Sequence, residues 1–480
     1  MAIQPPRVLL ASFAVVLSSF SVHADTYRLS ADSLPTSWQM SQQCFQTLPT
    51  DDAWWQSFQD PVLTDLIEKA VNNNYNVAAA LKRIDMASQI VRQAKASYFP
   101  TLNASAGWSR SQDSGAAEDP VVRSSSSSSF TLGADMNWEI DVFGRVRKNV
   151  AAKKAAYNVA RADYDAVLVS LCADVATSYL ELRTTQRQIQ MANDHIEHQQ
   201  QVVKLTEARF DAELGNMLDV TQARIVLYST QSKLPSLEAK VKTLINTISV
   251  LIGVDPGEVT EKVIHPKPMP GFVQQISAGV PADILRRRPD IVQSELQLAE
   301  YAALIGVAKA DFLPTLSLTG SIGTEAHNIK NLFGAHSLYY SVAPQLSWTI
   351  FEGMARNARL AEARLQMEAA IDDYNMTVLN ALQEVDNALI QYNTLLNTIT
   401  LQKKVVEQSY KSMVLSVDLY RNGLTAFSNV VDGQMSYLEN QNELVELEGT
   451  ALSTLVTIYK ALGGGWTIAC NNTCTDTGAN

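Results

Sequence analysis

A strand pattern that runs directly into a very long helix pattern is the feature that most constrains the fold of this chain. From Ser129 to Val142, apolar or small residues alternate with polar ones, the period of a β-strand with one apolar and one polar face. From Arg145 to Leu214, 70 residues follow without a glycine or a proline. A helix of that length would measure about 105 Å. No compact domain needs such a helix, so the sequence indicates an elongated molecule.

The same order of segments occurs twice in the chain. AKASYFPTL (94–102) recurs as AKADFLPTL (308–316), and RFDAELGNMLDV (209–220) matches LYRNGLTAFSNV (419–430) at an offset of 210 residues. Self-similarity of this kind is typical of two copies of one structural unit. We therefore predict an internal two-fold repeat.

Each repeat is predicted to hold a short helix, two strands, a long helix and a return helix. In repeat 1 (75–252), the strands cover about 101–112 and 128–142, the long helix about 145–214 and the return helix about 216–252. In repeat 2 (283–462), the corresponding ranges are about 314–324, 339–351, 354–422 and 424–462. Pro344 argues against the last strand, because proline cannot donate a ladder hydrogen bond. The segments outside the repeats are 25–74, 253–282 and the tail 463–480.

Residues 1–24 have the pattern of a secretory signal peptide. A short positive region at Arg7 precedes an apolar segment, and Val22-His23-Ala24 forms a small-residue cleavage site. No cysteine lies at the cut, so we expect no lipid attachment there.

An exported chain meets an oxidising compartment, so Cys470 and Cys474, four residues apart, are predicted to form a local disulfide. Cys172 lies in a helical pattern and is expected to be buried.

The four predicted strands have the length and alternation of membrane-spanning β-strands. Their apolar face is rich in Trp, Leu and Ile, and Trp108, Trp138 and Trp348 are candidate anchors at the membrane interface. The alternative is a half-buried sheet in a soluble protein. No stretch of 18 consecutive apolar residues is present, so we expect no transmembrane helix.

Four strands cannot close a barrel, and an open sheet edge does not occur in lipid. Several copies must then share one barrel. Two copies would give eight strands, whose interior is filled by side chains, whereas three copies give twelve strands and leave a lumen. The polar face of the strand, with Asp135, Glu139 and Asp141, is expected to line the water in that lumen.

Several segments, taken together, resemble the TolC-like outer-membrane factor family and in particular its OprM-type (RND efflux) group. They are DDAWWQSFQDPVLTDLIEKAVNNNYNV near the start, KLPSLEAKV (233–241), DILRRRPDIVQSELQLAEY (283–301), AKADFLPTLSL and ALGGGW (461–466). The resemblance covers nearly all of the chain beyond the signal peptide.

The resemblance implies a mostly α-helical fold with a transmembrane β-barrel. It implies a homotrimer with a 12-stranded β-barrel, a 12-helix α-barrel and an equatorial region built from the chain ends and the segment between the repeats. It also implies an outer-membrane location and docking to a periplasmic adaptor and an inner-membrane pump. The expected function is the exit duct of a tripartite pump that exports small molecules such as drugs. Many OprM-type members carry a lipidated N-terminal cysteine, which this chain lacks.

The resemblance also places a gate at the periplasmic hairpin turns. The family's tip tyrosine aligns with Tyr420 and its partner aspartate with Asp219, which implies a hydrogen bond between the two hairpins. An arginine of the family aligns with Thr425, so one of the usual links is missing. The family's pore-lining aspartate pair falls on Asn429 and Asp432, which retains one acid of the two.

The two hairpin turns are the expected docking tip for the adaptor. Gly215 and Gly423 are expected to mark the breaks in otherwise unbroken helices. The candidate docking residues are Leu214, Gly215, Gly423, Leu424 and Thr425.

No motif of a catalytic site is found in the sequence. It contains no HExxH, P-loop, GxSxG or GxGxxG pattern, so we expect neither an enzyme nor a cofactor. His195 and His198 could hold a metal but are expected to lie on a solvated helix face. The formal charge of −11 argues against nucleic-acid binding. The remaining alternatives are an exit duct for type I protein secretion, a periplasmic helical adaptor and an enzyme on a helical scaffold.

Overall fold

The computed structural model describes residues 45–46, 53–112, 126–264, 266–267, 269–270, 276–277 and 287–464. The predicted signal peptide lies outside the described residues. So do Cys44, Cys470 and Cys474, and with them the predicted disulfide. Cys172 lies in the core and is fully buried.

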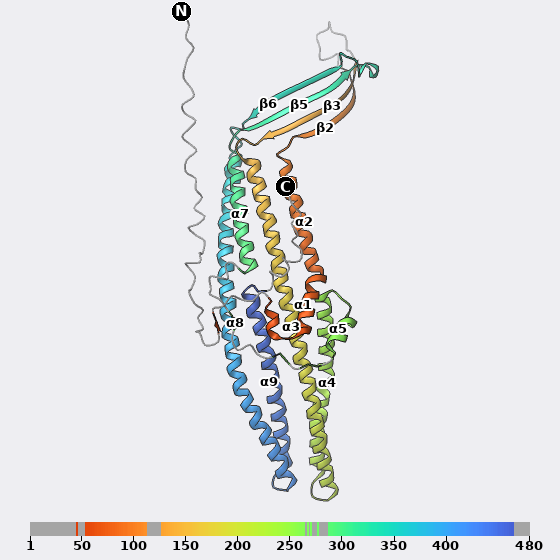
Figure 1. Ribbon diagram of the computed structural model, residues 1–480, viewed down its shortest axis with the longest axis vertical. Helices are drawn as coiled ribbons and strands as arrows, with labels where there is room; N and C mark the ends of the chain where they lie inside the picture. Colours follow the sequence, from red (N-terminus) through yellow and green to blue (C-terminus); the bar gives the residue numbers. More distant parts are fainter. Residues whose placement is uncertain are drawn as a thin grey trace, which may run out of the picture.

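The two repeats have the same elements at nearly the same lengths, and the predicted fold class is confirmed (Figure 1). Repeat 1 consists of α2 (Tyr75–Ala96), β2 (Thr101–Gln112), β3 (Ser126–Ile140), α3 (Arg145–Asp211) and α4 (Met217–Ile252). Repeat 2 consists of α7 (Pro289–Ala310), β5 (Thr315–Ala326), β6 (Leu338–Ser347), α8 (Ala355–Arg421) and α9 (Phe427–Ala461), with a short helix η5 (Ile329–Asn331) between its strands. The long helices α3 and α8 have 67 residues each.

Short elements surround the long helices at mid-length (Figure 1). They are η3 (Trp54–Phe58), α1 (Pro61–Asn73), α5 (Pro256–Val263) and a parallel pair, β1 (Phe45–Gln46) with β4 (Ile276–Ser277). Trp54 is fully buried and stacks on Tyr459 of α9, with ring centroids 5.2 Å apart. The phenol of Tyr179 in α3 donates a hydrogen bond to the carboxylate of Asp60. These contacts attach the segment before repeat 1 to the helices of both repeats.

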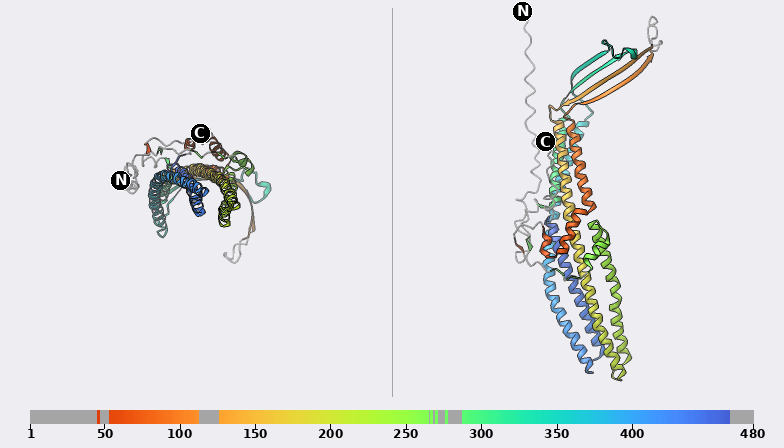
Figure 2. Two further views of the ribbon diagram at one scale, coloured as in Figure 1. Left: turned by 90° about the horizontal axis from the view of Figure 1, so that it is seen from below. Right: turned by 45° about the vertical axis from the view of Figure 1, so that its right-hand side comes forward.

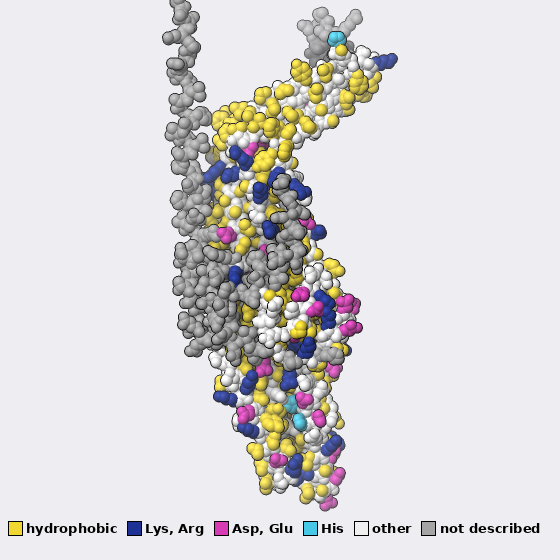
Figure 3. Space-filling model, in the orientation of Figure 1, with side chains coloured by type: hydrophobic (Ala, Val, Ile, Leu, Met, Phe, Trp, Pro, Cys, Tyr) yellow, Lys and Arg dark blue, Asp and Glu magenta, His cyan; other side chains and the backbone are white. Residues whose placement is uncertain are grey.

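The four longer strands form one antiparallel sheet in the order β2-β3-β5-β6. In this register, odd-numbered residues pair with odd-numbered residues on every neighbouring strand. For example, Ser105 pairs with Gly133, Gly133 with Gly323, and Gly323 with Tyr339. Odd-numbered residues of all four strands therefore share one face, which is almost entirely Ser, Thr, Gly, Asn, Gln and acids. The even-numbered face carries the large apolar residues, and Figure 3 shows hydrophobic side chains over much of the sheet.

The last strand differs from the prediction at its end and at its proline. It stops at Ser347, so Trp348 lies just beyond it. Pro344 remains inside β6 and pairs with Leu318 of β5. Within this chain β6 is an edge strand that pairs only with β5, and Pro344 removes one backbone N–H donor from the strand.

The junction between strand and helix uses two of the acids that were expected to line the lumen. Glu139 binds Arg145, with Nε–Oε1 at 2.9 Å, and Asp141 accepts hydrogen bonds from the N–H groups of Val146 and Arg147. Asp141 binds there because the exposed N–H groups at the start of α3 bind the nearest carboxylate. That Glu139 and Asp141 face lumen water stays a prediction. Asp135 lies farther into the strand and is exposed on the polar face.

The helices form a curved wall with two free edges. Seen from below, they follow an arc, with α8 at one end and α4 at the other (Figure 2). Both outer helices expose large apolar side chains, among them Ile225 and Tyr228 on α4 and Leu401 and Leu415 on α8. Among the described residues, no helix is both long enough and apolar enough to cross a membrane.

Candidate functional site

The two hairpin turns at the lower end of the wall have the same hydrogen-bond pattern. Leu214 N donates to Arg209 O at 2.8 Å, and the equivalent Leu424 N donates to Leu419 O at 2.8 Å. A left-handed residue closes each turn. In repeat 2 it is Gly423 (φ 74°), and in repeat 1 it is Glu213 (φ 59°), which the offset of 210 residues aligns with Gly423. Gly215 and Gly423 both lie in the breaks between the helices, as predicted, because α3 ends at Asp211 and α4 begins at Met217, and α8 ends at Arg421 and α9 begins at Phe427.

The hydrogen bond expected between the hairpins is present. Tyr420 Oη at the end of α8 donates to Asp219 Oδ2 in the first turn of α4, at 2.9 Å. Tyr420 is only 4% exposed and packs edge-on against Phe427. Burial and the bond to Asp219 raise the pKa of Tyr420 to about 12. The phenol therefore stays protonated and remains a donor at any physiological pH.

Arg209 is a second link between the hairpins, and no pattern in the sequence indicates it. Its Nη1 donates to Arg421 O of α8 at 2.7 Å, and its Nη2 donates to Leu214 O in its own turn at 3.0 Å. Its guanidinium also lies over the Tyr420 ring, 4.8 Å from the ring centroid. The side chain thus contacts the turn of repeat 1, the end of α8 and the candidate gate tyrosine at once.

The other candidate gate residues lie on the exposed surface of α9. Asp432 and Asn429 are both exposed, and Asn429 Nδ2 donates to Thr425 Oγ1 at 2.6 Å. Thr425 therefore bonds within its own hairpin. The exposed Asp432 lies one turn farther along α9 from Asn429, and its carboxylate pairs with no other residue that the structure describes.

The tips themselves expose leucines. Leu214 is 67% exposed and the equivalent Leu424 is 73% exposed, and Met217 and Leu218 beside the first turn are also exposed. Apolar side chains in such numbers at the end of a molecule are typical of a protein contact surface.

The three candidate anchor tryptophans differ in their contacts. Trp108 is exposed on the apolar face of β2, beside Phe130. Trp138 and Trp348 are repeat equivalents, and their indole N–H groups donate to the carbonyls of Tyr98 and Phe312, at 3.0 and 3.1 Å. Each of these two indoles therefore ties the sheet to the end of the short helix of its own repeat.

His195 is buried, so the expectation of a solvated face was wrong for it. Its Nε2 lies 2.6 Å from Gln441 Oε1 of α9, and its ring packs on Tyr437. Burial lowers the pKa of the His195 imidazole. The polar residues around it in α3 suggested solvent, but the face they form packs against the other hairpin. His198 is exposed, as expected.

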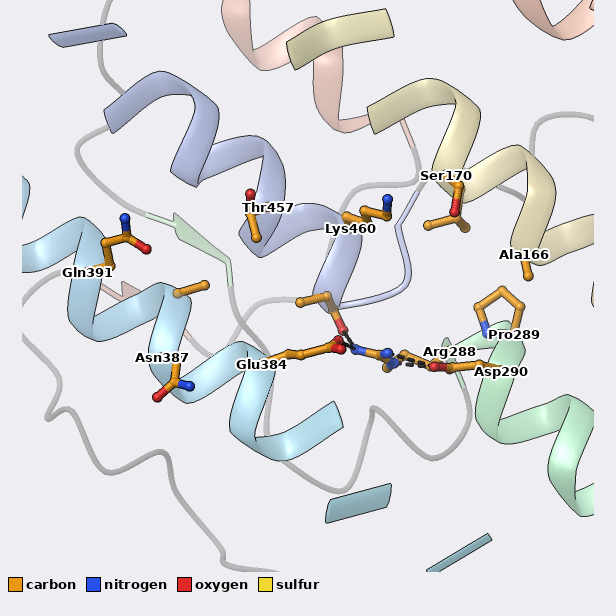
Figure 4. Close-up of a pocket in the computed structure, with 13 residues that line it drawn as sticks. Ala166, Ser170, Arg288, Pro289, Asp290, Glu384, Asn387, Gln391, Thr457 and Lys460 are labelled. Atoms are coloured by element: carbon orange, nitrogen blue, oxygen red, sulfur yellow. Dashed lines mark hydrogen bonds and ion pairs between the residues drawn. The ribbon is translucent and has the colours of Figure 1, made fainter. Parts of the chain in front are cut away.

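A pocket of about 610 Å³ lies at mid-length, where α9 ends and α7 begins (Figure 4). Arg288 crosses it and donates to both oxygens of Asp290, to Glu384 of α8 and to the carbonyl of Ala461. Arg288 belongs to the RRRP segment that the resemblance picked out. Its donors join three helices, so the charges in the pocket neutralise one another.

The comparisons with known proteins agree with this geometry. The family model described as "Outer membrane efflux protein" matches residues 66–254 and 280–464. The chain is 31% identical over 443 residues to the pyoverdine export outer membrane protein OpmQ of Pseudomonas putida, covering 90% of this chain and 92% of OpmQ. It is 29% identical to the solvent efflux pump outer membrane protein SrpC of Pseudomonas putida, covering 86% and 87%.

The similarity to known proteins also holds for the three-dimensional structure. The structure of the outer-membrane channel OprN superposes with a TM-score of 0.84 at 30% identity, covering 90% of this chain and 97% of OprN. Two family-model matches, one on each repeat, together span more than half of the chain. The chain therefore belongs to the outer membrane efflux protein family and is an outer-membrane efflux channel.

Proposed function

We propose that three copies of this chain form one continuous duct, and that this duct is the exit of a tripartite pump for small molecules. The sheet is the observation that carries the proposal. It has one polar and one apolar face, and its edge strands β2 and β6 each pair on one side only, with β3 and β5, so that their outer edges are unpaired within the described sheet. A sheet of this kind is satisfied in lipid only when its edges pair with other copies.

The helices support the same assembly. Both ends of the arc expose apolar side chains, on α4 and on α8, and these would be covered when α4 of one copy packs against α8 of the next. Three copies of a four-stranded sheet give twelve strands, which leave a lumen. The polar face of the sheet then lines the lumen, and the apolar face contacts lipid.

Small molecules are the proposed cargo because relatives of similar length export them. OpmQ is named for pyoverdine export and SrpC for solvent efflux. The exposed leucines at the tips are the proposed docking surface for a periplasmic adaptor, which would connect the duct to an inner-membrane pump. The links between the hairpins are the proposed closed gate.

Asp432 is proposed to set the ion selectivity at the narrow end. Three copies place three carboxylates there, and these attract cations and repel anions. Asp432→Asn is expected to weaken cation selectivity and block by multivalent cations, whereas Asn429→Asp, which raises the number of acids to six, is expected to strengthen both. Reversal potentials in planar bilayers under a salt gradient measure the change.

Glu407→Gln is the matched control for Asp432. Glu407 is an exposed acid on α8 that pairs with Lys411, at 2.6 Å, and lies higher on the hairpin. Its removal should leave the reversal potential unchanged. Unaltered selectivity in both Asp432→Asn and Asn429→Asp would place the narrow end elsewhere.

Export from cells tests the proposed function. A Gram-negative strain without its own outer-membrane efflux channels accumulates a fluorescent pump substrate. Expression of this chain, together with a periplasmic adaptor and an inner-membrane pump of a tripartite efflux system, should restore export, and expression without the adaptor should not. Restored export of a secreted protein, with no effect on small molecules, would overturn the assignment of cargo.

A further inference from the structure

One aromatic side chain lies flat on the polar face of the sheet. Tyr339 is the only aromatic residue at an odd position of the four strands as the structure describes them. It is 39% exposed, whereas Tyr340, the next residue and on the apolar face, is 78% exposed. A tyrosine that pointed straight out from an edge strand would be as exposed as its neighbour, so the ring of Tyr339 is held against the wall.

Two glycines make room for this ring. A Cβ at Gly323 would lie 2.7 Å from Tyr339 Oη and 2.8 Å from its Cζ, and a Cβ at Gly133 would lie 2.9 Å from the same Oη. Gly133, Gly323 and Tyr339 occupy one row of the register on strands β3, β5 and β6. The ring therefore extends from β6 across β5 to β3, over positions where any side chain would displace it.

We propose that Gly133 and Gly323 form a slot that holds Tyr339 against the wall and thereby set the free aperture of the duct at this row. The inference rests on the proposed function, because it takes the polar face of the sheet as the lining of a lumen. In the trimer, three such rings would lie on the wall. If the slot were filled, each ring would turn toward the lumen axis, and the aperture would narrow from three sides.

The aperture matters for the size of the cargo. The row of Gly133, Gly323 and Tyr339 lies toward the end of the sheet that is farther from the helices, near the start of β6. The other positions of the polar face carry small or polar side chains, so no other described aromatic projects from that face. Filling the slot should therefore exclude bulky solutes before small ones.

Conductance in planar bilayers tests the slot. The variants are made in the background Tyr420→Phe with Asp219→Ala, so that the tips do not limit the current. Gly133→Ala is the main variant, because its Cβ meets the mobile end of Tyr339 first, whereas a Cβ at Gly323 would also meet the backbone oxygen of Leu132 at 2.7 Å. It should lower the unitary conductance and reduce the size of the largest polyethylene glycol that enters the pore.

A second substitution distinguishes the aperture from simple packing. Adding Tyr339→Ala to Gly133→Ala should restore both the unitary conductance and the size of the largest polyethylene glycol that enters the pore, since no ring is left to displace. Gly320→Ala and Tyr340→Ala, on the apolar face, are the controls, because a Cβ at Gly320 meets only ordinary contacts at 3.5 Å and beyond. A Gly133→Ala trimer that melts earlier but conducts as before would overturn the proposal, and so would a loss that persists without Tyr339.

Cryo-electron microscopy gives a reading that does not depend on the gate. In the Gly133→Ala trimer, the Tyr339 ring should be displaced toward the lumen, and a ring still seated over Gly323 would overturn the proposal. Absence of conductance in every variant, including the background, would instead count against the proposed duct itself. The two failures are therefore distinguishable.

Discussion

Replacing Tyr420 by Phe and Asp219 by Ala in one chain is expected to turn a closed channel into a leaky one. The pair removes the 2.9 Å hydrogen bond between the hairpins in each copy. Such a bond contributes about 1 kcal/mol per copy, so three copies that open together would shift the equilibrium by about 3 kcal/mol, or roughly a hundredfold. Resting conductance in planar bilayers measures this shift, and cells should become sensitive to large antibiotics.

The guanidinium of Arg209 over the Tyr420 ring predicts that resting conductance rises stepwise as the links between the hairpins are removed. Arg209→Gln removes the bond to the Arg421 carbonyl and the contact with the Tyr420 ring, so it should add to the effect of the double variant. Tyr410→Phe is the matched control, because Tyr410 lies on the same helix and its ring packs on Tyr437 rather than on the other hairpin. A double variant as tightly closed as the parent would leave the gate assignment without support.

Charged residues at the two tip leucines are expected to abolish export while leaving the trimer intact. Leu214→Asp and Leu424→Asp place a carboxylate where an apolar side chain, 67% and 73% exposed, is proposed to be covered by the adaptor. A leucine that is fully covered contributes about 1.5–3 kcal/mol, and the trimer carries six such tips. The minimal inhibitory concentration of a pump substrate and co-purification of the adaptor measure the loss.

Two further variants separate docking from folding. Leu424→Met keeps an apolar side chain of similar volume and should retain export. Thr425→Glu adds a charged side chain next to the same turn, without restoring the arginine that the family has there, and should reduce export. Thermal stability of the trimer should remain at the parental value in all of them. Unchanged drug resistance with Leu214→Asp and Leu424→Asp combined would exclude docking at the tips.

The helices and strands could be predicted because the sequence patterns that indicate them lie within each element. The alternation of side chains around Trp138 and the absence of glycine and proline from Arg145 to Leu214 depend on one element at a time. The register of the four strands follows the same alternation, since a slip by one residue would exchange the two faces. The hydrogen bond between Tyr420 and Asp219 was found through the resemblance and not through any pattern in the residues.

His195 and Arg209 were missed because their partners are distant in the sequence. His195 was placed in solvent because its neighbours in α3 are polar, but α9 covers that face. Arg209 has no sequence signal, because its acceptor is a backbone carbonyl of α8. Glu213 takes a left-handed conformation that favours glycine, and only the alignment with Gly423 could have located it. The slot beneath Tyr339 requires the register of three strands at once.

The number of chains in the conducting particle distinguishes a shared duct from a duct closed by one chain. We expect that one chain cannot close the duct, because its sheet has two edge strands, β2 and β6, and its helix arc has two apolar ends. Native mass spectrometry of the detergent-purified protein, followed by planar-bilayer recording of the same sample, should find three chains per particle and channel activity. A particle of one chain that conducts as well would contradict the account.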